Sequence, residues 1–171
     1  GYSTKTLNND PYYPNQHYFK ETTVYKGASS IERAIIEKQQ NNLNRLLNIG
    51  VVDSGYVVHE DVIYEQGQNF IAGELNRAEG AEDISFNFDR SGSCVLGHGS
   101  QVSGLIGALR DNDTGIAGIV NTKLTPARVA EMIECTTENI ETVDVANAIF
   151  WLSGFPVVDV VPRDENVDII N

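Results

Sequence analysis

Short apolar runs and helically spaced apolar positions alternate along most of this chain. Residues 47–52 form a short, mainly apolar run that ends at Asp53, which is typical of a buried parallel strand with a polar residue at its carboxyl end. A helix is predicted to begin at His98, because apolar residues recur after it at the spacing of a buried helix face: Val102, Leu105, Ile106 and Leu109. The same predicted helix also contains four poor helix formers, which indicate close approach to a neighbouring backbone: Gly99, Ser103, Gly104 and Gly107.

The same patterns predict elements on either side of these two. Residues 29–45 are predicted to form a helix, because Ser30 is a good N-cap and apolar residues follow it on one face. Short strands are predicted over residues 69–72 and 124–130. The polar, glycine-containing stretch 74–93 is predicted to be a surface loop.

The last helix is predicted over residues 138–152, with Thr137 as its candidate cap and acidic residues near its start. Its inner face is expected to carry four apolar residues: Ile140, Val143, Ala146 and Ile149. Residues 167–170 begin a further strand. Prolines near the start disfavour helix at the residues before them, so residues 1–28 are expected to be an extended arm with tyrosines as anchors.

The elements therefore follow the order helix, strand, strand, helix, strand, helix, strand. Such alternation predicts an α/β fold, with a parallel β-sheet flanked by helices on both faces. Because the chain stops inside a strand, we expect residues 1–171 to be the N-terminal part of a single domain, with the α/β portion spanning 29–171. Sites in open α/β sheets form outside the carboxyl ends of strands, where Asp53 is placed.

The composition narrows the possible functions. The chain has 171 residues, 41% of them hydrophobic, which is enough for a domain with a sizeable core. Its formal net charge of −12 argues against nucleic-acid binding, which needs clustered lysines and arginines. The acidic balance leaves open a solvated surface or a site for calcium, whose ligands are carboxylate oxygens. No apolar run reaches the roughly eighteen residues of a membrane span.

Three motifs carry the strongest functional signal, because they occur together and in order. They are residues 51–55 (Val-Val-Asp-Ser-Gly), residues 98–104 (His-Gly-Ser-Gln-Val-Ser-Gly) and residues 115–119 (Gly-Ile-Ala-Gly-Ile). Together they resemble the subtilisin-like serine proteases of the secreted bacterial type. That family has apolar-apolar-Asp-(Ser/Thr)-Gly, then His-Gly-Thr-His-Val-Ala-Gly, then Gly-Val-Ala-Gly-Val.

The resemblance implies a serine endopeptidase that hydrolyses proteins or peptides. Asp53 and His98 would be two members of an Asp-His-Ser triad, with His98 as the base and Asp53 orienting it. The nucleophilic serine would lie beyond residue 171, in the C-terminal remainder of the domain, which could be a separate chain. Gln101 and Ser103 depart from the family pattern, and we expect altered packing without lost catalysis. The alternative is a non-catalytic half-domain of this fold, used for binding or assembly.

The resemblance also gives a role to the two cysteines. Several secreted bacterial members carry one cysteine before the histidine motif and another in the substrate-edge loop, and Cys94 and Cys135 occupy matching places. This implies a disulfide and a secreted, extracytoplasmic protein, with two buried free thiols as the alternative. The substrate edge is expected over residues 133–136: Ile133, Glu134, Cys135 and Thr136.

Family members often bind structural calcium on surface loops, which directs attention to two acidic clusters. One is Asp111-Asn112-Asp113, and the other comprises Asp159, Asp164, Glu165 and Asp168. Neither has the spacing of an EF-hand, and plain solvated loops are the alternative. The expected hydrolysis itself needs no cofactor.

Overall fold

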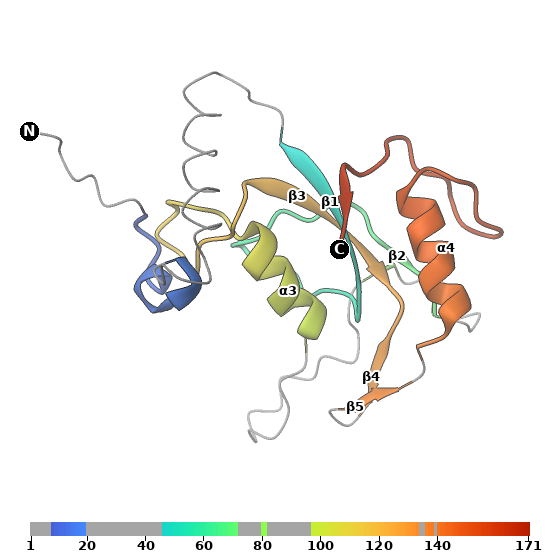
Figure 1. Ribbon diagram of the computed structural model, residues 1–171, viewed down its shortest axis with the longest axis horizontal. Coiled ribbons are helices and arrows are strands. Elements are labelled where there is room, and N and C mark those ends of the chain that lie inside the picture. The colour runs from blue at the N-terminus through green and yellow to red at the C-terminus, as the bar shows by residue number, and fades with distance from the viewer. Residues whose placement is uncertain (1–7, 20–45, 72–79, 82–96, 134–135, 139) are drawn as a thin grey trace, which may run out of the picture.

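The computed structural model describes residues 8–19, 46–71, 80–81, 97–133, 136–138 and 140–171 (Figure 1). A four-stranded sheet of order β2-β3-β1-β6 lies at its centre, and every neighbouring pair in it is parallel. Its strands are β1 (Leu47–Asp53), β2 (Gln68–Asn69), β3 (Thr122–Arg128) and β6 (Ile169–Ile170). The other elements are α3 (His98–Gly107), α4 (Thr142–Leu152), and an antiparallel hairpin of β4 (Glu131–Ile133) and β5 (Thr136–Glu138).

Strands β1 and β3 are paired over their full lengths and end together. Their register runs from Leu47 opposite Thr122 to Asp53 opposite Arg128. Asp53 is the last residue of β1, so the predicted polar strand end lies at the carboxyl edge of the sheet. The predicted strand at 69–72 is shifted, because β2 covers only Gln68–Asn69 and Ile71 lies outside it.

The two helices cover opposite faces of the sheet. Val102 and Ile106 of α3 pack against a cluster formed by side chains on one face: Ile49, Val51 and Leu124. Helix α4 packs on the other face, where its buried residues meet Val52 and Ala127. The α/β class with helices on both faces is therefore confirmed.

The order of the strands makes the two crossover connections differ in hand. Helix α3 lies between β2 and β3 in the chain, and α4 lies between β3 and β6. Both connections step across the sheet in the same direction, since the order is β2-β3-β1-β6. Because the helices lie on opposite faces, the two crossovers must have opposite hands, and one of them belongs to the rare left-handed class.

Helix α3 is shorter than its apolar pattern predicts. It ends at Gly107, so Leu109 lies beyond it, and Leu105 is 44% exposed. Its buried positions are occupied by small residues: Gly99, Ser103, Gly104 and Gly107. The prediction of close backbone approach is confirmed, because these small residues let the helix lie directly against its neighbours.

Two predictions about α4 are wrong. The helix begins at Thr142 after the N-cap Glu141, and the candidate cap Thr137 lies in β5. Of the predicted inner face, Ile140, Val143 and Ile149 are exposed, whereas the buried side chains are Asp144, Ala148, Trp151 and Leu152. The latter set also follows helical spacing, and tertiary contacts choose between the two sets: Leu152 lies over Gly50, and the Trp151 Nε1–H donates to the Val161 carbonyl at 2.8 Å.

The described part of the N-terminal arm is folded into turns. Residues 8–19 contain two short 3₁₀ helices, Tyr13–Asn15 and His17–Phe19, in place of the expected extended conformation. Tyrosine anchoring is seen at Tyr13 and Tyr18, which pack with Phe19 and Ala117. The predicted helix over 29–45 and all but two residues of the predicted loop over 74–93 lie outside the described residues. Within the described ranges, no helix is long and apolar enough to cross a membrane.

Candidate active site

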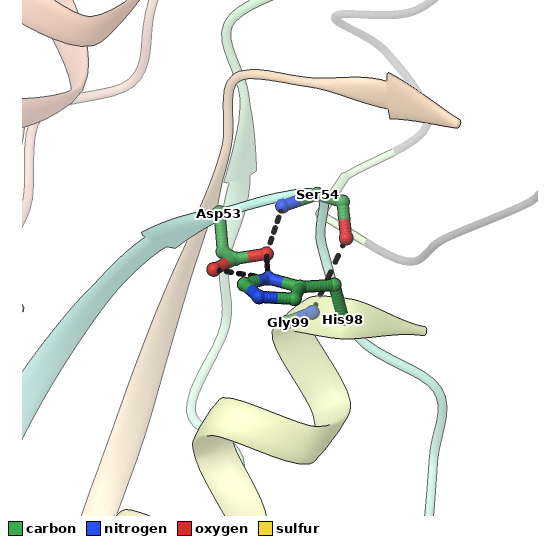
Figure 2. A network of polar contacts seen from close by, with 4 residues as sticks. All are labelled: Asp53, Ser54, His98 and Gly99. Atoms are coloured by element: carbon green, nitrogen blue, oxygen red, sulfur yellow. Dashed lines mark hydrogen bonds and ion pairs between the residues drawn. The ribbon is translucent and has the colours of Figure 1, made fainter. Parts of the chain in front are cut away.

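The structure brings the two predicted catalytic side chains into contact. The His98 Nδ1 atom lies 2.8 Å from Asp53 Oδ1 and 3.0 Å from Asp53 Oδ2 (Figure 2). The aspartate comes from the carboxyl end of β1 and the histidine from the first residue of α3. The Asp53 side chain is 16% exposed and the His98 side chain is 64% exposed, so a shielded acid supports an open imidazole.

Local hydrogen bonds hold Asp53 in place. The backbone N–H of Ser54 donates to Asp53 Oδ1 at 2.7 Å, so this oxygen accepts bonds from both its neighbour and the histidine. The Asp53 carbonyl accepts the N–H of Val129 at 2.9 Å, just beyond β3. Both the main chain and the side chain of the acid are therefore fixed by the strand ends.

Helix α3 begins in close contact with the end of β1. Its N-cap is Gly97, in the left-handed region with φ of 89°. A Cβ atom on Gly99 would lie 2.0 Å from the Gly55 carbonyl oxygen and 3.2 Å from Asp53 Oδ1. Only a glycine fits between the helix and the strand end, and this close approach puts His98 within reach of the carboxylate.

This arrangement can support general acid–base chemistry. A carboxylate on Nδ1 selects the tautomer with a proton on that atom and leaves Nε2 as the proton acceptor. It also stabilises the imidazolium that forms once Nε2 takes a proton. The pair can therefore activate a hydroxyl group placed on the open side of the ring.

A half-buried tyrosine lies near this region and cannot act as a base there. Val62 and Tyr64 pack against the same cluster as α3, and the ring of Tyr64 lies 4.2 Å from that of Tyr56, centroid to centroid. Burial raises the pKa of the Tyr64 phenol above its ordinary value of 10.0. Its hydroxyl is therefore neutral at physiological pH.

The expected substrate edge falls at a hairpin close to the sheet's carboxyl edge. Ile133 ends β4, Thr136 begins β5, and the two are paired. β4 starts three residues after β3 ends at Arg128, the register partner of Asp53. Residues 134–135 lie outside the described residues, and so does Cys94; the expected disulfide stays a prediction.

The two departures from the family motif occupy different environments. Gln101 is exposed on α3. Ser103 is buried, with 1% of its surface exposed.

Sequence reasoning missed two buried acids. Asp10 and Asp61 are 2% and 3% exposed, and both face the loop that contains the predicted cluster at 111–113. Asp10 accepts the backbone N–H groups of Asp111 and Asn112 at 3.2 and 3.0 Å, and Asp61 accepts the side-chain amide of Asn112 at 2.9 Å. These carboxylates are far from the loop in sequence, so the local clustering of acidic residues gave no sign of them.

The side chains of the second acidic cluster do not gather around a common point. Asp168 accepts the N–H of Asn48 at 2.8 Å, whereas Asp159, Asp164 and Glu165 are not gathered with it around a common point. In the parts of the chain that the structure describes, no three histidine, cysteine or acidic side chains are arranged to hold a metal ion.

A cavity of about 440 Å³ lies beside the sheet, and neither Asp53 nor His98 lines it. Its walls include Asn48 and Lys123, near the starts of β1 and β3, and Trp151 near the end of α4. Since Asp53 and His98 are at the carboxyl edge, this cavity is separate from the candidate active site.

These features define a class of protein: a subtilisin-like α/β fold in which an aspartate at the end of a central strand orients a histidine at the start of a helix. The model of the subtilase family matches residues 45–171, so the chain belongs to the subtilase family. The family assignment agrees with the resemblance carried by the three motifs.

A solved structure gives a matching fold. It is described as a protease from Pseudoalteromonas arctica and is 22% identical in sequence, with a TM-score of 0.69. The match covers 96% of this chain and 50% of that chain, so the present chain spans about half the length of the solved one. No curated protein matches the sequence.

Proposed function

We propose that the chain supplies the aspartate and histidine of a serine endopeptidase. His98 takes the proton of a serine hydroxyl through Nε2, while Asp53 holds the ring and stabilises the imidazolium. The same proton then passes to the leaving amine when the peptide bond breaks. The observation that carries this proposal is the placing of both Asp53 carboxylate oxygens within 3.0 Å of His98 Nδ1.

The nucleophilic serine and the oxyanion donors belong, in this proposal, to the C-terminal remainder of the domain. The remainder either continues the polypeptide or associates with it as a separate chain. Support comes from the length of the match, since this chain corresponds to half of the solved structure. A serine from outside would reach the exposed side of the His98 ring.

The substrate is proposed to be a protein or peptide that lies along residues 133–136. The hairpin begins three residues after Arg128, the register partner of Asp53, and an extended peptide can add as a strand to the edge of such a hairpin. The acidic Glu134 favours basic side chains in the substrate. Replacing Glu134 by glutamine should reduce a preference for lysine or arginine, measured as the ratio of kcat/KM for basic and neutral peptides.

The catalytic proposal is tested with the complete protein that includes the serine-bearing part. A fluorophosphonate probe should label that part, and a general protein substrate should be cleaved. His98→Ala should abolish both, whereas His17→Ala, at an exposed histidine in a 3₁₀ helix, should preserve both. Cleavage by His98→Ala at the wild-type rate would exclude His98 as the base. Absence of labelling and cleavage in the wild type would favour the non-catalytic half-domain.

We also propose that the protein is secreted and carries a disulfide between Cys94 and Cys135. A bond across the intervening loop would stabilise the fold by about 4 kcal/mol on the chain-entropy model. Reduction should therefore lower the Tm of the wild type and leave the Tm of a Cys94→Ala/Cys135→Ala variant unchanged. An equal response of the two proteins would contradict the bond.

A structural calcium ion is proposed on the surface loop of the acidic cluster Asp111-Asn112-Asp113. Asp111 and Asp113 are exposed there, and carboxylate oxygens are suitable calcium ligands. Removing calcium with a chelator should lower the Tm, and Asp113→Asn should weaken this response; a chelator-independent Tm would contradict the site.

A further inference from the structure

Helix α3 carries the proposed base at its first residue, yet its own sequence provides no side-chain cap. The N-cap position is Gly97, which has no side chain and makes no capping bond. The first amides of a helix have no partner within the helix, and a buried start needs one. The second residue of α3, Gly99, is buried, so its N–H must be satisfied from another element.

That partner comes from the residue that directly follows the strand carrying the proposed acid. The Ser54 Oγ accepts the Gly99 N–H at 3.2 Å in a buried contact, and Ser54 is 2% exposed (Figure 2). Ser54 directly follows Asp53, and its own N–H bonds to the Asp53 carboxylate. One residue thus contacts both the acid and the start of the helix that bears the base.

A second bond runs between the same two segments with the roles exchanged. The Ser100 Oγ on α3 accepts the Val57 N–H at 2.7 Å. Each segment therefore offers a serine hydroxyl to a backbone amide of the other. The pattern is that of a reciprocal helix cap, with its two halves placed on different elements. We call Ser54, Ser100 and the two amides the serine clasp.

We propose that Ser54 and Ser100 are positioning residues for the Asp53–His98 pair. His98 lies between two glycines, Gly97 and Gly99, which restrain the backbone weakly. The serine clasp supplies that restraint and sets the distance between the carboxylate and Nδ1. The proposal rests on the proposed function, because it concerns the same pair.

The clasp is tested by nuclear magnetic resonance on the complete protein that includes the serine-bearing part, with no substrate bound. The measurements are the low-field proton signal of His98 Nδ1–H and the hydrogen exchange of the Gly99 and Val57 amides. Ser54→Ala should weaken the Nδ1–H signal and speed exchange at Gly99 by roughly two- to tenfold, the range expected for one lost hydrogen bond. Ser100→Ala should do the same at Val57, and Ser54→Thr should restore the wild-type behaviour.

Ser103→Ala is the matched control, because Ser103 is a buried serine of the same helix and is not part of the clasp. It should leave the Nδ1–H signal and both amides unchanged. A wild-type signal and wild-type amide exchange in Ser54→Ala would overturn the proposal, as would an equal change in Ser103→Ala. If Ser54→Ala fails to fold, Ser100→Ala decides in the same way. A catalytically inactive complete protein would refute the proposed function and leave these results standing.

Discussion

The tightest contact in the candidate site predicts the effect of one methyl group. Replacing Gly99 by alanine would put a Cβ atom 2.0 Å from the Gly55 carbonyl oxygen, whereas ordinary contact begins at 3.4 Å. The obstacle is a backbone atom two residues beyond Asp53, and it cannot move aside as a flexible side chain can. We therefore expect Gly99→Ala to push α3 away from β1.

The structure sets the size of the effect. Restoring ordinary contact needs a shift of about 1.4 Å, and the Asp53–His98 bond is 2.8 Å long, so the shift would carry it past hydrogen-bonding distance. Overpacking of this kind costs about 1–3 kcal/mol. In a domain of this size each kcal/mol lowers the Tm by roughly 2–4 °C.

The assay compares two alanine variants of the same helix by urea unfolding. Gly104→Ala is the matched control, because its Cβ would meet only the Ile116 side chain at 3.5 Å, an ordinary contact. Alanine is a better helix former than glycine by about 0.5–1 kcal/mol, so Gly104→Ala should be neutral or stabilising. Gly99→Ala should have a lower free energy of unfolding, and the low-field signal of the His98 Nδ1–H proton should disappear. If the two variants behave alike, the reasoning is refuted.

Three further substitutions test packing in different parts of the fold. Burial raises the pKa of Tyr64, so the protonated phenol stabilises the fold below pH 10.0, and this stabilisation is lost as the pH rises through the folded-state pKa. Tyr64→Phe should therefore lessen the fall in Tm above pH 10.0, whereas Tyr12→Phe, at a ring that is 59% exposed, should not. Leu152→Ala should cost about 2–5 kcal/mol in urea unfolding, because Leu152 is fully buried, and Ile149→Ala, at a 42% exposed side chain, should cost less. Arg110→Lys should cost about 0.5–1 kcal/mol in the same assay, since the guanidinium lies 5.3 and 5.9 Å from two ring centroids.

The central strand and the start of α3 could be predicted because both depend on short-range patterns. An apolar run that ends in a polar residue identifies β1 with Asp53 at its end, and a small-residue helix pattern identifies α3 with His98 at its start. The resemblance to the subtilisin-like proteases, carried by the three motifs, then implied that these two side chains meet. The 2.8 Å contact confirms that geometry.

The errors have a common physical cause, since they concern features that only tertiary contacts decide. Helical spacing gives the period of α4 but not which face is buried, and the contacts of Trp151 and Leu152 select the face opposite to the one predicted. The acids Asp10 and Asp61 are separated from their loop by many residues, so no local pattern links them. The same holds for the Ser54 cap of α3.

The Asp53–His98 pair is organised by contacts that lie within this chain. The Ser54 N–H bond to the carboxylate, the serine clasp and the close approach of Gly99 to Gly55 all join residues 53–57 to one another or to the start of α3. A carboxylate that is only 16% exposed interacts more strongly with an imidazolium than a fully solvated one, while the 64% exposed ring stays open to a hydroxyl from outside. We therefore expect these local contacts to orient the His98 ring before the proposed serine-bearing part associates. The low-field His98 proton should therefore already be present in the isolated chain and should shift little when that part binds.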